Sequence, residues 1–253
     1  MLAYDPLGGS PAATAVPTAV SSAAYQRFYA EVAAAQLRQW LPAEPCSLLD
    51  LSGGEGSFGK IAADAGHQVL HVVEPGTPKP SANAGMRVVQ ADPTDLSWIS
   101  SQRFDAVLAE GRALSHCLAT EHALDDVARV LQPGGRLLLC VDSLLAGMAR
   151  LADQQLWAEL ADVPLADVVL VPGAGGTITR CFWPEELRAM LVDAGLEVEW
   201  VRPRTVLSAD AVERALAADP GQLSRLVHAE TVLAQDREGD AHGVHLVASA
   251  RRA

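Results

Sequence analysis

A stretch that begins at Leu48, LLDLSGGEGSFGK, combines one acidic residue with closely spaced glycines. Small or polar residues occupy alternate positions in it, namely Asp50, Ser52, Gly54 and Gly56. Gly54-x-Gly56-x-x-Gly59 also has the spacing of a dinucleotide-binding loop. Glycines let the backbone turn tightly and approach a ligand closely, and a helix that follows offers free N–H groups. The stretch is typical of a cofactor-binding loop, but glycine spacing alone does not identify the cofactor.

Acidic residues near this loop distinguish two ligand classes. Glu74 lies 20 residues after Gly54, where a dinucleotide enzyme places the acid that binds ribose hydroxyls. Asp50, however, directly precedes the glycines, and a carboxylate there would oppose a pyrophosphate. The same carboxylate suits a ligand with an ammonium and a sulfonium, and Asp92 could accept a hydrogen bond from an adenine amino group. An NAD-dependent dehydrogenase is therefore the weakest alternative.

Strands and helices alternate through the first part of the chain. Apolar runs predict strands at 47–52, 67–74, 86–92, 104–110 and 136–142, and helical patterns occur at 57–66 and 121–131. This alternation implies a parallel sheet with right-handed crossovers. Two later strand-like segments, 196–207 and 243–252, predict an antiparallel edge. We expect an α/β fold with a doubly wound, mostly parallel sheet.

Acidic residues fall at or just after the carboxyl ends of the predicted strands. They are Asp50, Glu74, Asp92, Glu110 and Asp142. Ligands of open parallel sheets bind outside these strand ends, at the switch in strand order. The sequence therefore predicts that the five acids surround one crevice.

The acids, the glycine loop and the Pro-Gly-Gly turn of VLQPGGRLLL together resemble the class I S-adenosylmethionine-dependent methyltransferases. The resemblance runs from about Leu48 to Asp142, with looser agreement to the C-terminus. It implies a Rossmann-like fold with a seven-stranded sheet that ends in an antiparallel hairpin. It also implies transfer of a methyl group from S-adenosylmethionine to an O or N nucleophile of a small molecule, in specialised metabolism.

The resemblance assigns residues of this chain to parts of the cofactor. Along the methionine part it places Asp50, Ser52, Gly54 and Gly56. Glu74 takes the ribose hydroxyls, and Asp92 takes the adenine. Glu110 falls beside the amino-acid group and the substrate entrance.

Three features depart from the family pattern. Ser52 stands where the family has its first loop glycine, and Glu55 adds a negative charge inside the loop. Segment 75–85, PGTPKPSANAG, predicts a loop where the family usually has a helix beside the adenine. These departures motivate a second hypothesis, a methyltransferase-like protein that does not methylate. It would act as a partner subunit or catalyse another reaction in the same crevice.

His116, in EGRALSHC, is the candidate general base because it follows the fourth predicted strand. An imidazole with a pKa near neutrality could accept a proton from a hydroxyl or amine nucleophile. The alternative is a structural histidine at the start of a helix. The sequence shows no cluster of metal-ligating residues.

The segments outside the predicted sheet are expected to form a tail and two covers on a single domain. Residues 1–22 predict a mobile tail, and 23–253 a single methyltransferase-like domain. A helix is predicted at 23–42, and its aromatic face either packs against the domain or closes as a lid over the site. The segment 144–182 is predicted to cover the substrate. The aromatic face carries Tyr25, Phe28 and Tyr29.

Composition limits the partners. The chain of 253 residues has a formal net charge of −12, which makes it a poor candidate for binding nucleic acid. No apolar run is long enough to cross a membrane, and the four cysteines form no C-x-x-C pair. We therefore predict a cytoplasmic protein with a small-molecule substrate. The acceptor and the oligomeric state cannot be read from the sequence.

Overall fold

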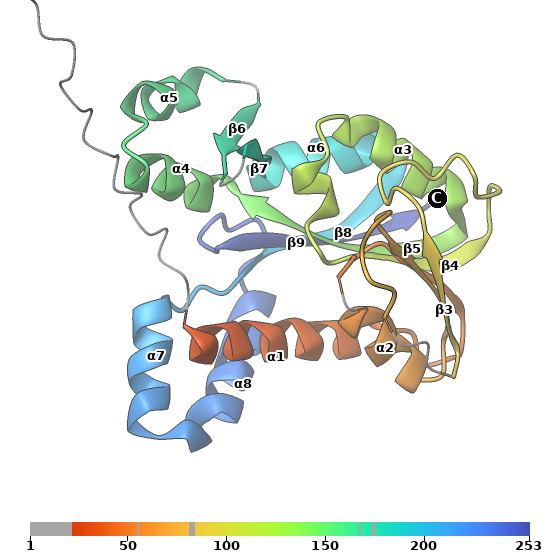
Figure 1. Ribbon diagram of the computed structural model, residues 1–253, viewed down its shortest axis with the longest axis horizontal. Helices are drawn as coiled ribbons and strands as arrows, with labels where there is room; N and C mark the ends of the chain where they lie inside the picture. The colour runs from red at the N-terminus through yellow and green to blue at the C-terminus, as the bar shows by residue number, and fades with distance from the viewer. Residues whose placement is uncertain (1–21, 55, 81–83, 167, 174–175) are drawn as a thin grey trace, which may run out of the picture.

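A mixed sheet with helices on both faces forms the molecule (Figure 1). The computed structural model describes residues 22–54, 56–80, 84–166, 168–173 and 176–253. Its strands are β1 (Ser47–Asp50), β2 (Gln68–Val73), β3 (Met86–Gln90), β4 (Phe104–Ala109), β5 (Leu131–Ser143), β6 (Val169–Pro172), β7 (Ile178–Phe182), β8 (Leu196–Arg204) and β9 (His245–Arg252). The predicted tail, apart from residue 22, lies outside the described residues.

The first five strands are parallel and follow the order β3–β2–β1–β4–β5. Strand β9 pairs antiparallel with β5, and β8 pairs antiparallel with β9. The prediction of a mostly parallel sheet with an antiparallel C-terminal pair is confirmed. The strand order reverses between β1 and β4, and ligands of open α/β sheets bind at that point, outside the carboxyl ends of the strands.

The expected sheet has seven strands, and the segment 144–182 adds two more. Strands β6 and β7 form an antiparallel hairpin, and β7 pairs in parallel with Asp142 and Ser143 at the end of β5. Strand β5 has 13 residues, and its pairing with β4 ends at Leu139, so its last residues extend past β4 and leave an edge for β7. The described sheet therefore has nine strands.

The helices divide between the two faces of the sheet (Figure 1). They are α1 (Ala23–Trp40), α2 (Ser57–Asp64), α3 (Thr120–Val130), α4 (Leu144–Asp153), α5 (Trp157–Asp162), α6 (Pro184–Asp193), α7 (Ala209–Ala218) and α8 (Leu223–Gln235). Apolar residues of α3 and α6 pack on one face, and those of α1 and α2 on the other. None of the described helices is long and apolar enough to cross a bilayer.

Helix α1 is held at both of its ends. Its C-terminal part buries Leu37 and Trp40 against the sheet. Its N-terminal part buries Tyr25 and Phe28 in a separate cluster with Val212 of α7. Packing therefore accounts for these two aromatic side chains, and the lid function of the helix stays a prediction.

Candidate functional site

A cavity of about 850 Å³ opens at the carboxyl ends of the parallel strands. This volume lies in the range of small-molecule and cofactor sites, roughly 300–1,000 Å³. The predicted site residues that line it are Ser52, Gly54, Glu74, Asp92 and His116. His116 is exposed at the end of a short 3₁₀ helix, η1 (Ala113–His116). A cavity therefore lies at the predicted edge, but of the five acids expected around it only Glu74 and Asp92 line it.

Two of the five strand-end acids present free carboxylate oxygens to this cavity. Glu74 directly follows β2 and is exposed. Asp92 Oδ1 accepts hydrogen bonds from the backbone N–H and the hydroxyl of Thr94, at 2.8 and 2.7 Å. These bonds orient the side chain and leave Oδ2 available to a ligand. Both acids can accept hydrogen bonds from hydroxyl or amino groups.

Asp50 is fully buried beneath the glycine loop and does not line the cavity. Its Oδ2 lies 2.8 Å from Nδ1 of His71, and its Oδ1 accepts a hydrogen bond of 2.9 Å from the backbone N–H of Ser52. A Cβ atom at Gly59 would lie 2.4 Å from Oδ2 of Asp50, so α2 can approach β1 only because residue 59 is glycine. Gly59, the last glycine of the dinucleotide-like spacing, is therefore needed for the packing of α2 against β1.

The buried pair of Asp50 and His71 sets the charge beneath the loop. Burial disfavours a charged imidazole, but the hydrogen bond and the negative charge of Asp50 outweigh it, so the pKa of His71 is raised above 6.5. Gly56, the residue before α2, has φ of 71° and lies over the His71 ring, where an added Cβ would be 3.2 Å from two ring atoms. Glu55 lies outside the described residues.

The loops after β1 and β4 are joined at Ser52. Its hydroxyl accepts a hydrogen bond of 3.1 Å from the backbone N–H of Glu110. A Cβ atom at Gly111 would lie only 1.8 Å from the carbonyl oxygen of Ser52, so the two loops can touch only with glycine at 111. The serine at the family's glycine position therefore ties the loop to its neighbour.

Glu110 is directed away from the cavity and into a buried ion pair. Its two carboxylate oxygens accept hydrogen bonds of 2.6 and 3.0 Å from Arg204, at the end of β8, and both side chains are fully buried. Arg204 Nε also donates to Oε1 of Gln36 on α1, at 2.6 Å. Burial opposes the arginine charge, but Glu110 outweighs it and raises the pKa of Arg204.

Asp142 is the third buried acid of the edge. Its Oδ1 accepts a hydrogen bond of 2.9 Å from Arg150, and Arg112 lies 3.4 Å away. His245 Nε2 is 3.8 Å from the same oxygen, but burial lowers the pKa of His245 to about 3, so this imidazole is neutral at ordinary pH. Asp142 is therefore compensated by two arginines.

The five acids thus divide by whether a basic partner reaches them. Asp50, Glu110 and Asp142 are paired beneath the edge, and Glu74 and Asp92 face the cavity. Among the described residues that line the cavity, none is lysine or arginine. A negative lining favours a cationic ligand with hydroxyl and amino groups and disfavours a pyrophosphate.

The connection between β2 and β3 is the loop that the sequence predicts. Its described residues, 74–80 and 84–85, contain no helix, and residues 81–83 lie outside the described part. Pro75 and Thr77 of this loop line the cavity. The loop therefore forms part of the wall where the family usually has a helix.

Sequence reasoning missed the basic partners. His71 gave a local signal, since it is a polar residue within the apolar strand HQVLHVVE and is paired in register with Asp50. Arg204 gave none, because it is 94 residues from Glu110 and only the fold brings the two together.

Comparison with known proteins gives a match to one family model and several solved structures with the same fold. A family model described as "Methyltransferase domain" matches residues 49–139. Demethylmenaquinone methyltransferase of Clavibacter sepedonicus is 33% identical over 99 residues, which cover 37% of this chain and 40% of that relative. The match thus spans less than half of the relative's length.

Solved structures share the fold at low identity. The Burkholderia thailandensis 1,6-didemethyltoxoflavin-N1-methyltransferase, with bound 1,6-didemethyltoxoflavin and S-adenosylhomocysteine, is similar with a TM-score of 0.54 and 18% identity over 91% of this chain and 78% of that chain. The [4+2]-cyclase SpnF is similar with a TM-score of 0.51 and 18% identity over 88% of this chain and 80% of that chain.

The raised pKa of His71 predicts a pH-dependent contribution to stability. Because the folded pKa exceeds the unfolded one, the contribution is fully present below about pH 6.5 and is lost as pH rises through the folded pKa. The loss of unfolding free energy in His71→Gln should be larger at about pH 6 than at about pH 9 in urea titrations. The exposed control His228→Gln should cost little at either pH. An equal deficit for His71→Gln at both pH values would contradict this assignment.

The buried ion pair predicts a large cost for removing one charge. Glu110→Gln leaves Arg204 charged and buried, and should lower the unfolding free energy by about 3–5 kcal/mol in urea titrations. Glu121→Gln breaks a pair whose carboxylate is exposed, and should cost about 1 kcal/mol or less. The double variant Glu110→Leu, Arg204→Met should be more stable than Glu110→Gln, since neither charge remains. A cost for Glu110→Gln as small as that of Glu121→Gln would rule this out.

Proposed function

We propose that the chain is a class I S-adenosylmethionine-dependent methyltransferase and that it transfers a methyl group from S-adenosylmethionine to an oxygen or nitrogen of a small molecule. The match of residues 49–139 to a methyltransferase domain and the fold shared with a solved methyltransferase support this proposal. The observation that carries the proposal is the cavity at the carboxyl edge, where Glu74 and Asp92 are the free acids. Its negative lining suits a ligand with a sulfonium and an ammonium.

The residues of the cavity fit the parts of this cofactor. Glu74 would accept hydrogen bonds from the ribose hydroxyls, and Oδ2 of Asp92 from the adenine amino group. The backbone of Ser52–Gly54 would hold the methionine part, with Asp50 supporting it from below through the Ser52 N–H. When bound, the cofactor supplies an electrophilic methyl group on its sulfonium.

The chain's own contribution to transfer is alignment and proton acceptance. Holding the acceptor in line with the methyl group and excluding water account for much of such catalysis. His116 lines the cavity on the side of η1, and its imidazole would accept the proton that the acceptor loses. We propose the segment 144–182 and α1 as covers of the acceptor.

A small molecule is the acceptor that the chain's properties favour. The net charge of −12 opposes binding to nucleic acid. The Burkholderia protein and the Clavibacter relative are named for methylation of small molecules, which supports the same class here. A role in specialised metabolism and a cytoplasmic location belong to this proposal, and the four free thiols agree with a reducing compartment.

A methyltransferase-like protein that does not methylate is the second candidate. Ser52 and the open loop of 74–80 depart from the family, and Asp50 and Glu110 are occupied by internal partners. A cyclase is among the proteins that share this fold. This candidate predicts cofactor binding without formation of S-adenosylhomocysteine.

Calorimetric titration with S-adenosylmethionine, S-adenosylhomocysteine and NAD tests the ligand class. We expect the first two to bind and NAD not to bind. Glu74→Ala removes charge-assisted hydrogen bonds and should weaken binding of S-adenosylmethionine about 10- to 100-fold. Glu185→Ala, an exposed acid of α6, is the control and should bind as the wild type does. Absence of binding at millimolar cofactor would refute the proposal.

His116→Ala tests the general base. With a panel of small phenols and amines as acceptors, its turnover should fall about 10²- to 10⁴-fold, measured as S-adenosylhomocysteine formed. Its affinity for the cofactor should change little. His122→Ala, at an exposed position of α3, should retain wild-type turnover. Full turnover in His116→Ala would remove this residue from the mechanism.

A further inference from the structure

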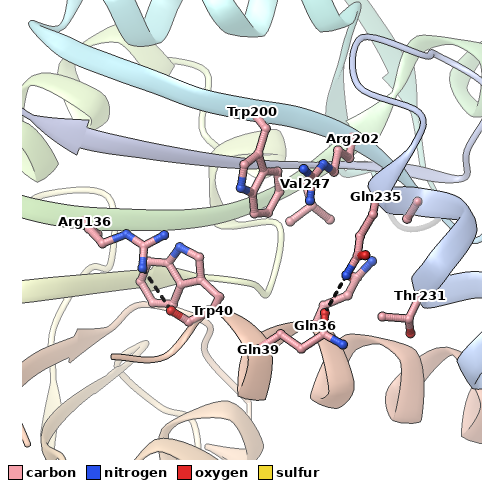
Figure 2. Close-up of a pocket in the computed structure, with 10 residues that line it drawn as sticks. Gln36, Gln39, Trp40, Arg136, Trp200, Arg202, Thr231, Gln235 and Val247 are labelled. Atoms are coloured by element: carbon pink, nitrogen blue, oxygen red, sulfur yellow. Dashed lines mark hydrogen bonds between the residues drawn. The ribbon is translucent and has the colours of Figure 1, made fainter. Parts of the chain in front are cut away.

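A second cavity, of about 200 Å³, lies between the sheet and the helices α1 and α8 (Figure 2). It shares no described lining residue with the cavity at the carboxyl edge. Arg136, one of its lining residues, precedes Asp142 by six positions along β5, which corresponds to about 20 Å of extended strand. The second cavity is therefore a separate site on the face of the sheet.

Two stacked pairs of an arginine and a tryptophan form its walls (Figure 2). The guanidinium of Arg136 lies over the ring of Trp40, 5.0 Å from the centroid, and that of Arg202 lies over the ring of Trp200 at 4.6 Å. Trp40 is fixed further, since its Nε1 donates a hydrogen bond of 2.8 Å to the Ser249 hydroxyl. Aromatic walls of this kind are suited to a flat ring.

The two arginines differ in their charge balance. Arg136 donates a hydrogen bond of 2.8 Å to Glu199, so its charge is compensated. The side chain of Arg202 forms no hydrogen bond or ion pair with any residue in the described part of the chain, and its Nε is buried without a partner. A buried donor without a partner is unfavourable, because its hydrogen bonds to water are lost and are not replaced. The cavity thus holds one uncompensated positive charge, in a protein whose net charge is −12.

Glutamine side chains from both helices complete the lining (Figure 2). Gln235 of α8 donates a hydrogen bond of 3.2 Å to Gln39 of α1, which joins the two helices beside the cavity. The Oε1 atom of Gln36 is occupied by Arg204, so its amide N–H groups are the part left for a ligand. The groups that Arg202 and Gln36 can offer are therefore hydrogen-bond donors, which suit an anion.

We propose that this cavity binds a small aromatic carboxylate, with one ring and one carboxylate group. The carboxylate would pair with the guanidinium of Arg202, whose planar donors match its two oxygens. The ring would lie against the indoles of Trp40 and Trp200. The cavity, of about 200 Å³, has room for a single ring with one carboxylate group. The proposal does not depend on the methyl-transfer activity.

Benzoate is the probe, and benzamide and inorganic phosphate are its controls. Binding is measured by calorimetry and by quenching of tryptophan fluorescence on the wild-type protein. We expect saturable binding of benzoate with a Kd of about 1 mM or tighter. Benzamide has the ring without the charge, and phosphate has charge without the ring, so each should bind at least tenfold more weakly. Binding of either control as tight as that of benzoate would overturn the proposal, as would no saturation up to about 10 mM benzoate.

Two arginine variants locate the site. Arg202→Gln should raise the Kd for benzoate at least tenfold, because the charge partner is removed. Arg225→Gln, at an exposed position of α8 outside the cavity, should leave the Kd unchanged. Thermal melting followed by circular dichroism checks that both variants are folded, and the ligand comparison on the wild type decides the question if Arg202→Gln is not. An unchanged Kd in folded Arg202→Gln would exclude this cavity as the site.

Discussion

The buried ion pair between Glu110 and Arg204 is the constraint on which the arrangement of the edge depends. Both side chains are removed from water, so each charge is tolerated only because the other lies within hydrogen-bonding distance. The pair fixes the end of β4 against the end of β8, and Gln36 extends the contact to α1. The backbone of residues 110–111 then fixes the glycine loop through Ser52. A long-range electrostatic contact therefore helps to position a loop that is rich in glycine.

The need of a buried charge for a partner of opposite charge also explains why acids at equivalent strand ends have different roles. An acid that meets a basic side chain from a neighbouring element becomes part of the frame, as Asp50 does with His71. An acid without such a partner stays hydrated and available to a ligand, as Glu74 does. Position at the carboxyl end of a strand thus places a carboxylate near the site, and the neighbouring strands and loops decide whether it faces the ligand.

Local sequence patterns were sufficient to predict most of the fold. Features that depend on contacts between distant residues could not be predicted. The strands, the order of elements and the loop after β2 follow from apolar runs and prolines, because these signals act within a few residues. The β6–β7 hairpin was not predicted, since the segment 144–182 was expected only as a cover and the place of the hairpin depends on β5 extending past β4. The lining of the cavity by Glu74 and Asp92 was predictable from strand ends. The burial of Glu110 was not, because its partner is 94 residues away.

Ser52 shows how a departure from a family pattern can be part of the structure. A glycine at this position would leave the N–H of Glu110 without the hydroxyl that now accepts its hydrogen bond. Glycine is required at 111 for a separate reason, because any side chain there would collide with the backbone carbonyl of residue 52. The two loops are therefore joined by a side-chain hydrogen bond and by a close backbone contact, and the chain of contacts runs on from Glu110 through Arg204 to Gln36 at the second cavity. The departure of Ser52 from the family's glycine is thus part of the contact that joins the loops after β1 and β4.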